Sequence, residues 1–127
     1  MDAPLPPHVS SAILMAVGLF IALLAVPLIR RRVGPNWLYG LRVRATFADE
    51  SVWYDANERS GRTLFALGAA TIAFGTGNMV VPEAISQPYF LAGILALVVG
   101  TIACAIDGWR YANRLLRERA GSDPGHT

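Results

Sequence analysis

Three runs of residues without a charged side chain dominate the sequence, and charged segments flank them. The runs cover residues 12–29, 64–81 and 89–106. Crossing the ~30 Å hydrocarbon core of a bilayer takes roughly 20 helical residues, a length that each run reaches with one or two flanking positions. Backbone groups in lipid must be satisfied internally, which favours helices. The pattern predicts an all-α membrane protein whose three transmembrane helices cover about residues 11–29, 63–81 and 89–107.

The composition supports this prediction, because the chain has few charged residues for its apolar content. Apolar residues make up 54% of the chain and charged residues 16%. A soluble domain has roughly 45–50% and about 25% of these classes, so the excess apolar surface is expected to face lipid. The segment before residue 11 lacks the basic region of a secretory signal, so we expect the first run to remain in the mature protein. The lone cysteine, Cys104, excludes an internal disulfide and a multi-cysteine metal site.

The distribution of positive charge predicts an orientation. All 11 basic residues are arginines; seven lie in residues 30–62 and four follow the third run, while the N-terminal segment and residues 82–88 hold none. Because basic residues collect on the cytoplasmic side of a membrane, the N-terminus is expected outside and the C-terminus in the cytoplasm of a multi-pass cell-membrane protein. The arginines flank apolar runs and do not line one soluble face, so nucleic-acid binding is not expected.

Small residues recur at every fourth position in the apolar runs. They are Gly18 and Ala22 in the first run, Ala69, Ala73 and Gly77 in the second, and Ala92, Ala96, Gly100, Cys104 and Gly108 in or just after the third. Such stripes allow helix backbones to approach closely in membranes. They predict packing among the three helices or, as the alternative, the seam of a homo-oligomer.

The loop of residues 30–62 is too aromatic for a plain solvated loop and too charged for a fourth span. Its aromatic rings suit the headgroup level of a bilayer, where amphipathic side chains settle. These rings belong to Trp37, Tyr39, Trp53 and Tyr54. Pro35-Asn36 predicts a turn, and Gly40 predicts either a positive φ or a close approach to another element.

A short cytoplasmic or interfacial helix is expected within this loop. Thr46 is the expected cap, with Asp49 three positions later, and the helix is expected to cover residues from 47 to about 57 or beyond. It either lies at the membrane interface or bends at residues 60–61 into the second span. The tail from about residue 120 to residue 127 is expected to be disordered.

The spacing of the loop residues resembles that of one protein family. The pattern consists of Pro35, Asn36, Tyr39, Gly40, Arg42, Thr46, Asp49, Trp53, Ala56, Asn57 and Gly61. It resembles the SdpI/YfhL family of bacterial membrane proteins, in whose C-terminal module such a loop joins the first two of three spans. The resemblance implies immunity to an antimicrobial killing-factor peptide through non-covalent binding at the membrane. It also implies a signalling role, in which a cytoplasmic repressor is held at the membrane.

Ligand or partner binding is predicted for the loop residues that carry the resemblance. These are Pro35, Asn36, Tyr39, Gly40, Arg42, Thr46, Asp49, Trp53 and Asn57. Arg42 and its neighbour Arg44 are candidates for binding an anionic group or lipid headgroups. Their alternative partners are the carboxylates of Asp49, Asp55 and Asp107.

Two polar residues near the ends of the apolar runs have simpler expectations. Asp107 is expected to form an ion pair with Arg110, three residues later on the same helix. Asn78 is expected to form an interhelical hydrogen bond.

No pattern of catalytic residues stands out. The sequence lacks an HExxH motif, a phosphate-binding glycine loop, a Ser-His-Asp set and zinc-ligand spacing. We therefore expect no enzymatic activity, no cofactor and no metal site. Two alternatives to peptide immunity remain open. One is a small transporter or channel subunit that oligomerises, and the other is a membrane scaffold that recruits a cytoplasmic regulator through the arginine-rich loop and tail.

Overall fold

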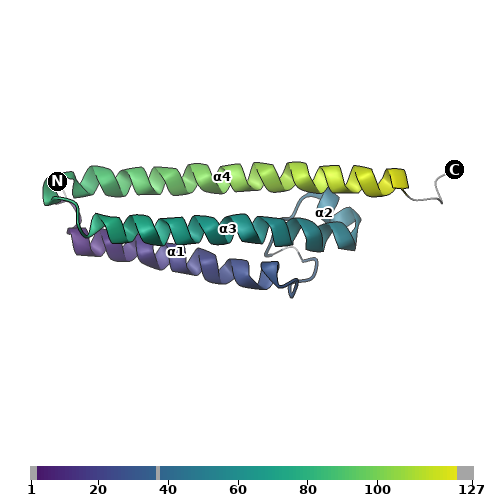
Figure 1. Ribbon diagram of the computed structural model, residues 1–127, viewed down its shortest axis with the longest axis horizontal. Helices are drawn as coiled ribbons and strands as arrows, with labels where there is room; N and C mark the ends of the chain where they lie inside the picture. Colours follow the sequence, from purple (N-terminus) through teal and green to yellow (C-terminus); the bar gives the residue numbers. More distant parts are fainter. Residues whose placement is uncertain (1–2, 37, 123–127) are drawn as a thin grey trace. The chain divides into compact units, whose positions relative to one another are not determined.

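The computed structural model describes residues 3–36 and 38–122, and α-helices make up most of them (Figure 1). The helices are α1 (Pro7–Ile29), α2 (Arg44–Ala48), α3 (Glu50–Asn78) and α4 (Glu83–Ser122). The predicted all-α class is confirmed. The predicted disordered tail starts too early, because α4 continues to Ser122. The rest of that tail, residues 123–127, lies outside the described residues, as does Trp37.

Within the part of the chain that the structure describes, two helices are long and apolar enough to cross a membrane. They are α1 and α4, and only 28% and 11% of their apolar stretches are buried within the protein. A core helix of a soluble protein would be mostly buried, whereas these apolar faces are open to their surroundings. This exposure is what a helix that faces lipid requires.

The third predicted span, at about residues 63–81, is shorter as a helix than its apolar run. α3 ends at Asn78, so the last three apolar residues of the run lie beyond it in a turn. Thr71 and Thr76 interrupt its apolar stretch, although each hydroxyl is satisfied by a carbonyl four residues earlier. α3 is therefore not one of the two candidate spans, and a third crossing stays a prediction.

Contacts divide the chain into two compact units. The apolar unit consists of residues 1–24 and 64–102, and the polar unit consists of residues 25–63 and 103–127. Each of α1, α3 and α4 contributes one part to each unit. The two units are described separately below.

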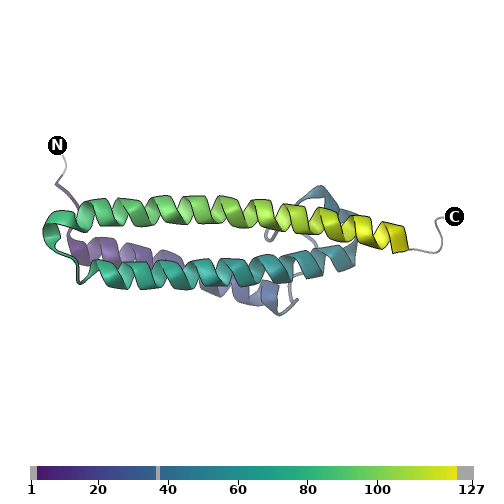
Figure 2. The ribbon, with the colours of Figure 1, turned by 45° about the horizontal axis from the view of Figure 1, so that its top comes forward.

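Glycines bring the helices of the apolar unit into close contact. A Cβ atom placed on Gly18 of α1 or on Gly68 of α3 would lie 2.6 Å from the carbonyl oxygen of the other glycine. Gly93 of α4 packs in the same way against the ring of Phe74, which stacks on Tyr89 with ring centroids 4.1 Å apart. Figure 2 shows these parts of α3 and α4 side by side.

The positions of the close contacts confirm the predicted stripes of small residues only in part. Gly18, Gly77, Gly100 and Gly108 pack against another helix as expected, because a Cβ atom on each would lie 2.7 Å or less from one of its atoms. Ala69, Ala73, Ala92 and Ala96 are exposed instead. The buried glycines of α3 are seven residues apart, at positions 61, 68 and 75. Seven residues make two turns when helices pack at 3.5 residues per turn, whereas a four-residue stripe drifts off the contact face. A role for the exposed stripes in a homo-oligomer stays a prediction.

A cluster of buried polar side chains joins the helices of the apolar unit. Asn78 is fully buried, and its amide nitrogen donates to the hydroxyl oxygens of Ser10, at 2.8 Å, and Ser11, at 3.2 Å. The Ser86 hydroxyl donates to the amide oxygen of Asn78 at 3.2 Å. The predicted interhelical hydrogen bond of Asn78 is confirmed, and it links residues of α1, α3 and α4.

Candidate functional site

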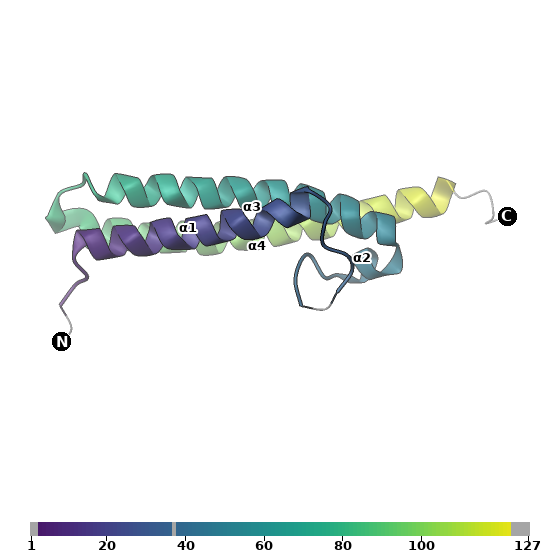
Figure 3. The same cartoon turned by 90° about the horizontal axis from the view of Figure 1, so that it is seen from below.

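Within the polar unit, α1 ends in a Schellman motif. The N–H groups of Arg31 and Arg32 donate to the carbonyls of Leu28 and Pro27, at 3.2 and 3.0 Å. Arg31 adopts a left-handed backbone with φ of 57°, which costs an arginine about 1 kcal/mol. Its side chain then reaches α3, and Figure 3 shows the loop leaving α1 and leading through α2 to α3.

The loop after α1 is shaped by Asn36. Its side-chain oxygen accepts the N–H groups of Leu38, at 2.9 Å, and Tyr39, at 2.6 Å, and its amide donates to the Gly34 carbonyl. This arrangement confirms the predicted turn at Pro35-Asn36. Gly40 has φ of +106°, as the sequence suggested, and a Cβ atom there would lie 2.9 Å from the side-chain oxygen of Asn57.

Trp53 and Asn57 of α3 hold the loop in place. The indole N–H of Trp53 donates to the Val33 carbonyl at 2.8 Å, and the Asn57 side-chain oxygen accepts the Leu41 N–H at 2.6 Å. Both side chains are buried, with Trp53 fully inaccessible. Trp53 is therefore not exposed as an interfacial anchor, because its ring packs inside the polar unit; the placement of the loop's rings at the lipid headgroup level stays a prediction. In the structure, Trp53 and Asn57 attach the loop to α3. Ligand binding by these residues stays a prediction.

The start of α3 differs from the predicted start of the loop helix. Thr46 lies inside the short α2, where its buried hydroxyl oxygen accepts the Val43 N–H and lies 3.0 Å from the Leu41 carbonyl. Asp49 instead precedes α3, and its carboxylate accepts the N–H and the hydroxyl of Ser51. Those hydrogen bonds hold the pKa of Asp49 below its ordinary value.

α3 then runs without a break through residues 60–61 to Asn78. The helix expected from residue 47 to about residue 57 or beyond is interrupted at Asp49: residues 47 and 48 belong to α2, and α3 begins at Glu50 and continues into the apolar stretch. A carboxylate accepts hydrogen bonds from the first helical turn more strongly than a threonine hydroxyl that is already engaged by the loop.

A small apolar core joins α2, α3 and α4 in the polar unit. Its buried members are Ala45, Val52, Ala56 and Ala112, and Leu41, Val43, Tyr111, Leu115 and Leu116 pack around them. Small side chains at this core let the helices approach closely. The core fixes the backbone from which the charged side chains project.

Ion pairs in the polar unit join α3 to Arg31, which follows α1, and to the C-terminal part of α4. Arg31 bonds Asp55 at 2.6 Å and Glu58 at 3.1 Å, and Arg62 bonds the other oxygen of Glu58 at 3.0 Å. Arg119 of α4 pairs with the second oxygen of Asp55. These hydrogen bonds, first that of Arg31 and then that of Arg119, hold the pKa of Asp55 below its ordinary value.

The expected pairing of Asp107 with Arg110 is wrong. Asp107 pairs with Arg59 of α3, whose two nitrogens lie 3.2 Å from its two oxygens. The guanidinium of Arg59 also lies over the Tyr111 ring, 4.5 Å from its centroid. This fork-like contact with a ring beneath it is more favourable than a single local contact. Arg110 lies instead with Trp109, and both line a separate shallow hollow of α4.

Arg42 and Arg44 are exposed and form no ion pair with a described residue. Two of their three predicted partners, Asp55 and Asp107, are engaged by other arginines, so those pairings are wrong. Anion or headgroup binding by Arg42 and Arg44 stays a prediction.

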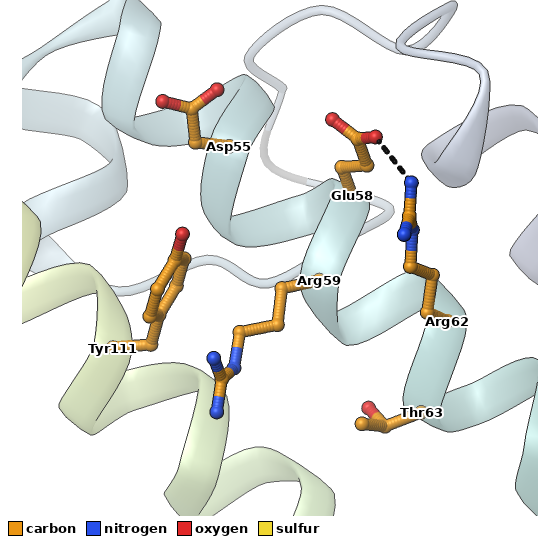
Figure 4. Close-up of a pocket in the computed structure, with 6 residues that line it drawn as sticks. All are labelled: Asp55, Glu58, Arg59, Arg62, Thr63 and Tyr111. Atoms are coloured by element: carbon orange, nitrogen blue, oxygen red, sulfur yellow. Dashed lines mark hydrogen bonds and ion pairs between the residues drawn. The ribbon is translucent and has the colours of Figure 1, made fainter.

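A charged cleft of about 460 Å³ opens between α3 and α4 in the polar unit (Figure 4). Its lining residues are Asp55, Glu58, Arg59, Arg62, Thr63 and Tyr111. In Figure 4 the Arg62 guanidinium points toward Glu58, and the Tyr111 hydroxyl points toward the end of the cleft that holds Asp55. The sequence prediction did not include this cleft as a site. Its signal is the helical spacing of the five α3 residues, which fall on one face at i, i+3, i+4, i+7 and i+8.

The fold and this site together define a helical protein that combines membrane-type helices with a compact, arginine-rich polar unit. The sequence model of the SdpI/YfhL protein family matches residues 32–106, which is more than half of the chain. The chain therefore belongs to the SdpI/YfhL protein family. The match includes the loop after α1 from residue 32 onward, all of α2 and α3, and α4 as far as residue 106. No curated protein and no solved structure matches the chain.

Proposed function

We propose that the protein is a bacterial cell-membrane protein that protects its cell from an antimicrobial peptide by binding it non-covalently at the membrane. Membership of the SdpI/YfhL family supports this proposal, since immunity to a secreted killing-factor peptide is what the resemblance implies. The observation that carries it is the loop itself. The matched segment includes a loop that is locked onto α3 by Trp53 and Asn57, as a preformed binding surface requires.

The proposed topology has three spans, with the N-terminus outside and the C-terminus in the cytoplasm. Its support is the separation of charge between the two units: every one of the 11 arginines lies in the polar unit, and the apolar unit has none. Arginine-rich segments of membrane proteins collect on the cytoplasmic side, so this separation supports a cytoplasmic polar unit. A fluorescent protein fused to the C-terminus should fluoresce, and alkaline phosphatase fused there should be inactive. The opposite pair of results would exclude this topology.

The surface proposed to bind the peptide consists of loop side chains that stay exposed when Trp53 and Asn57 hold the loop against α3. Arg42 follows Gly40 on the locked loop and is exposed, so its guanidinium is free to form charge-assisted hydrogen bonds with carboxylates of a peptide. No covalent step is involved. Trp53 and Asn57 act indirectly, because they set the position of the loop.

The test is a peptide challenge of a sensitive bacterial host that expresses the full chain. Expression should raise the concentration of killing peptide that the cells survive, and Arg42→Ala should lower it. Arg117→Ala removes the same charge from the exposed end of α4 and serves as the matched control, with membrane levels checked by immunoblot. Unchanged survival across a peptide panel, with the protein present in the membrane, would contradict the proposal. Recovery of a cytoplasmic regulator on the tagged full chain, without protection, would favour the scaffold alternative.

A further inference from the structure

A shallow hollow of about 380 Å³ lies on one flank of α4 in the polar unit. We call it the α4 hollow; its lining residues are Trp109, Arg110, Asn113, Leu116 and Arg117, and none of them lines the charged cleft. The five positions follow the spacing i, i+1, i+4, i+7 and i+8, which places them on about one third of the helix circumference. Leu116 also packs against the small apolar core, so the core fixes this flank of α4.

The polar side chains of the α4 hollow have no partner in the part of the chain that the structure describes. Arg110 and Arg117 form no ion pair with a described residue, and the side-chain amide of Asn113 forms no hydrogen bond with one. The lining has two positive charges and no carboxylate. The hollow therefore suits an anion, in contrast to the charged cleft, whose arginines and carboxylates balance.

Two of these side chains are close enough on the helix to donate to one anion. Arg110 and Asn113 are three residues apart, and side chains at that spacing are neighbours on a helix surface, with about 5–6 Å between their Cβ atoms. A guanidinium has five N–H groups and an amide has two, so the pair can donate to different oxygens of one phosphate. Arg117 lies two turns beyond Arg110, about 10 Å along the axis, so its charge adds attraction at longer range.

The α4 hollow borders the apolar run of α4. The run ends at Ile106 and Trp109 follows three residues later; they are 46% and 52% exposed. Arg110 is four residues beyond the run, about 6 Å along the helix. The headgroup layer on each side of a bilayer is about 5–8 Å thick, so Arg110 lies at the depth of the lipid phosphates when the run is in hydrocarbon. A lipid fits both the exposed apolar surface and the unpaired donors, whereas a soluble anion fits only the donors.

We propose that the α4 hollow binds the phosphate group of an anionic lipid, with Arg110 and Asn113 as donors and the Trp109 ring beside the upper part of the acyl chains. Arginine forms two parallel hydrogen bonds to phosphate oxygens, which suits a phosphodiester that bears one negative charge. A choline headgroup carries a cation next to its phosphate, and the lining has no carboxylate to pair with it. The inference requires that α4 lies in a membrane and does not depend on peptide immunity.

The experiment measures lipid binding to the full chain, purified and delipidated in a neutral detergent. Native mass spectrometry gives a dissociation constant for phosphatidylglycerol, for phosphatidylcholine and for inorganic phosphate. We expect phosphatidylglycerol to bind at least about tenfold more tightly than phosphatidylcholine, and Arg110→Gln to weaken its binding about tenfold. Asn113→Ala, which removes a neutral donor, should weaken it about threefold. Arg117→Gln should have a smaller effect than Arg110→Gln.

The matched control is Arg62→Gln, which makes the same charge change beside the apolar run of α3. Arg62 is exposed as Arg110 is, but it is paired with Glu58 and lies outside the α4 hollow. Its substitution should therefore leave the dissociation constant for phosphatidylglycerol unchanged. Because Arg110 is exposed and has no ion pair with a described residue, the unfolding midpoint of Arg110→Gln without lipid should match that of the parent. A folding defect is thus separable from a binding defect.

Three results would overturn the inference. Equal effects of Arg110→Gln and Arg62→Gln would show that net charge, and not the α4 hollow, attracts the lipid. Equal affinities for the two lipids would remove the selectivity for an anion. Binding of inorganic phosphate without binding of phosphatidylglycerol would show that a soluble anion is the ligand.

Discussion

The apolar and polar units contain parts of the same three helices but are stabilised by different interactions. In the apolar unit, glycines allow backbones to touch, and one buried asparagine is the main polar link. In the polar unit, side-chain hydrogen bonds lock a loop onto α3, and ion pairs surround it. A helix in lipid gains no hydrophobic energy from touching another helix, so close packing must hold it. In water, burial and polar attachment are both available.

The largest effect is expected at the centre of the polar unit. Trp53→Ala removes a fully buried indole and its hydrogen bond to the Val33 carbonyl, so the full chain in detergent should lose about 4 kcal/mol of unfolding free energy. Trp109→Ala removes an exposed indole and should cost less than about 0.5 kcal/mol. Equal losses in the two variants would mean that Trp53 is not the anchor of the loop.

In the apolar unit the largest effect should come from adding atoms. Gly68→Val places side-chain carbons against the backbone of α1, where a Cβ atom would already be 2.6 Å from the Gly18 carbonyl oxygen. The expected loss is about 3 kcal/mol. Ala69→Val adds similar volume to an exposed face and should be nearly neutral. Thermal unfolding of both variants in the same detergent measures the difference, and a neutral Gly68→Val would contradict the packing of α1 on α3.

The two buried asparagines allow a direct comparison of the units. Asn57→Ala leaves the half-buried Leu41 N–H without its acceptor and should cost about 2 kcal/mol. Asn78→Ala leaves serine hydroxyls that can turn to helix carbonyls, as Ser10 already does toward Pro7, so about 1 kcal/mol is expected. The same unfolding measurement on both variants tests the order. A larger loss for Asn78→Ala would mean that the hydrogen bonds of Asn78 stabilise the protein more than the hydrogen bond between Asn57 and the loop.

Arg31 should show two opposing contributions. Arg31→Gly relieves about 1 kcal/mol of left-handed backbone strain but removes the exposed pairs with Asp55 and Glu58, so the two contributions should largely cancel. Arg31→Ala removes the pairs without relieving the strain and should be the less stable variant. Comparison of the two unfolding midpoints isolates the strain. A midpoint for Arg31→Ala at or above that of Arg31→Gly would mean that the backbone at this position is relaxed.

The smallest effect is a dependence on acid. The pKa of Asp55 is lower in the folded protein than its ordinary value of 3.8, chiefly because of Arg31. The stabilisation of the folded protein by the ionised Asp55 is therefore fully present above the pKa of Asp55 in the unfolded chain. It is lost as the pH falls through the lower pKa of Asp55 in the folded protein. Unfolding midpoints measured from about pH 6 down to about pH 3 should decline less for Asp55→Asn than for the parent. Parallel declines would show that Asp55 does not sense acid.

Local chemistry explains which parts of this arrangement could be predicted. The turn at Asn36 and the positive φ at Gly40 follow from neighbouring residues alone, and both were expected. The start of α3 was misplaced because the hydroxyl of Thr46 is drawn to a carbonyl in the loop, a contact that spacing does not reveal. The partner of Asp107 was missed because Arg59 is 48 residues away in the chain. Such pairings depend on how α3 packs on α4.

The same limit applies to the apolar helices and the cleft. A four-residue repeat of alanines is conspicuous in the sequence, yet Gly68 and Gly75, seven residues apart, form the contact with α1. Only the packing angle of the helices selects between the two repeats. Predicting the cleft would have required both the polar face of α3 and the position of α4 against it, and the sequence indicates only the first. The polar face of α3 can be seen in the sequence as a helical pattern. The sequence does not show that Tyr111 of α4 lies beside this face.

The proposed topology puts the arginine-bearing unit in the cytoplasm and the connection between α3 and α4 outside the cell. Single cysteines test it most directly, introduced as Glu83→Cys or Arg117→Cys in a Cys104→Ala background, since both positions are exposed. Intact cells are treated with a membrane-impermeant maleimide. This topology predicts labelling of Glu83→Cys in intact cells and of Arg117→Cys only after the membrane is permeabilised. Labelling of Arg117→Cys in intact cells, with Glu83→Cys protected, would contradict it.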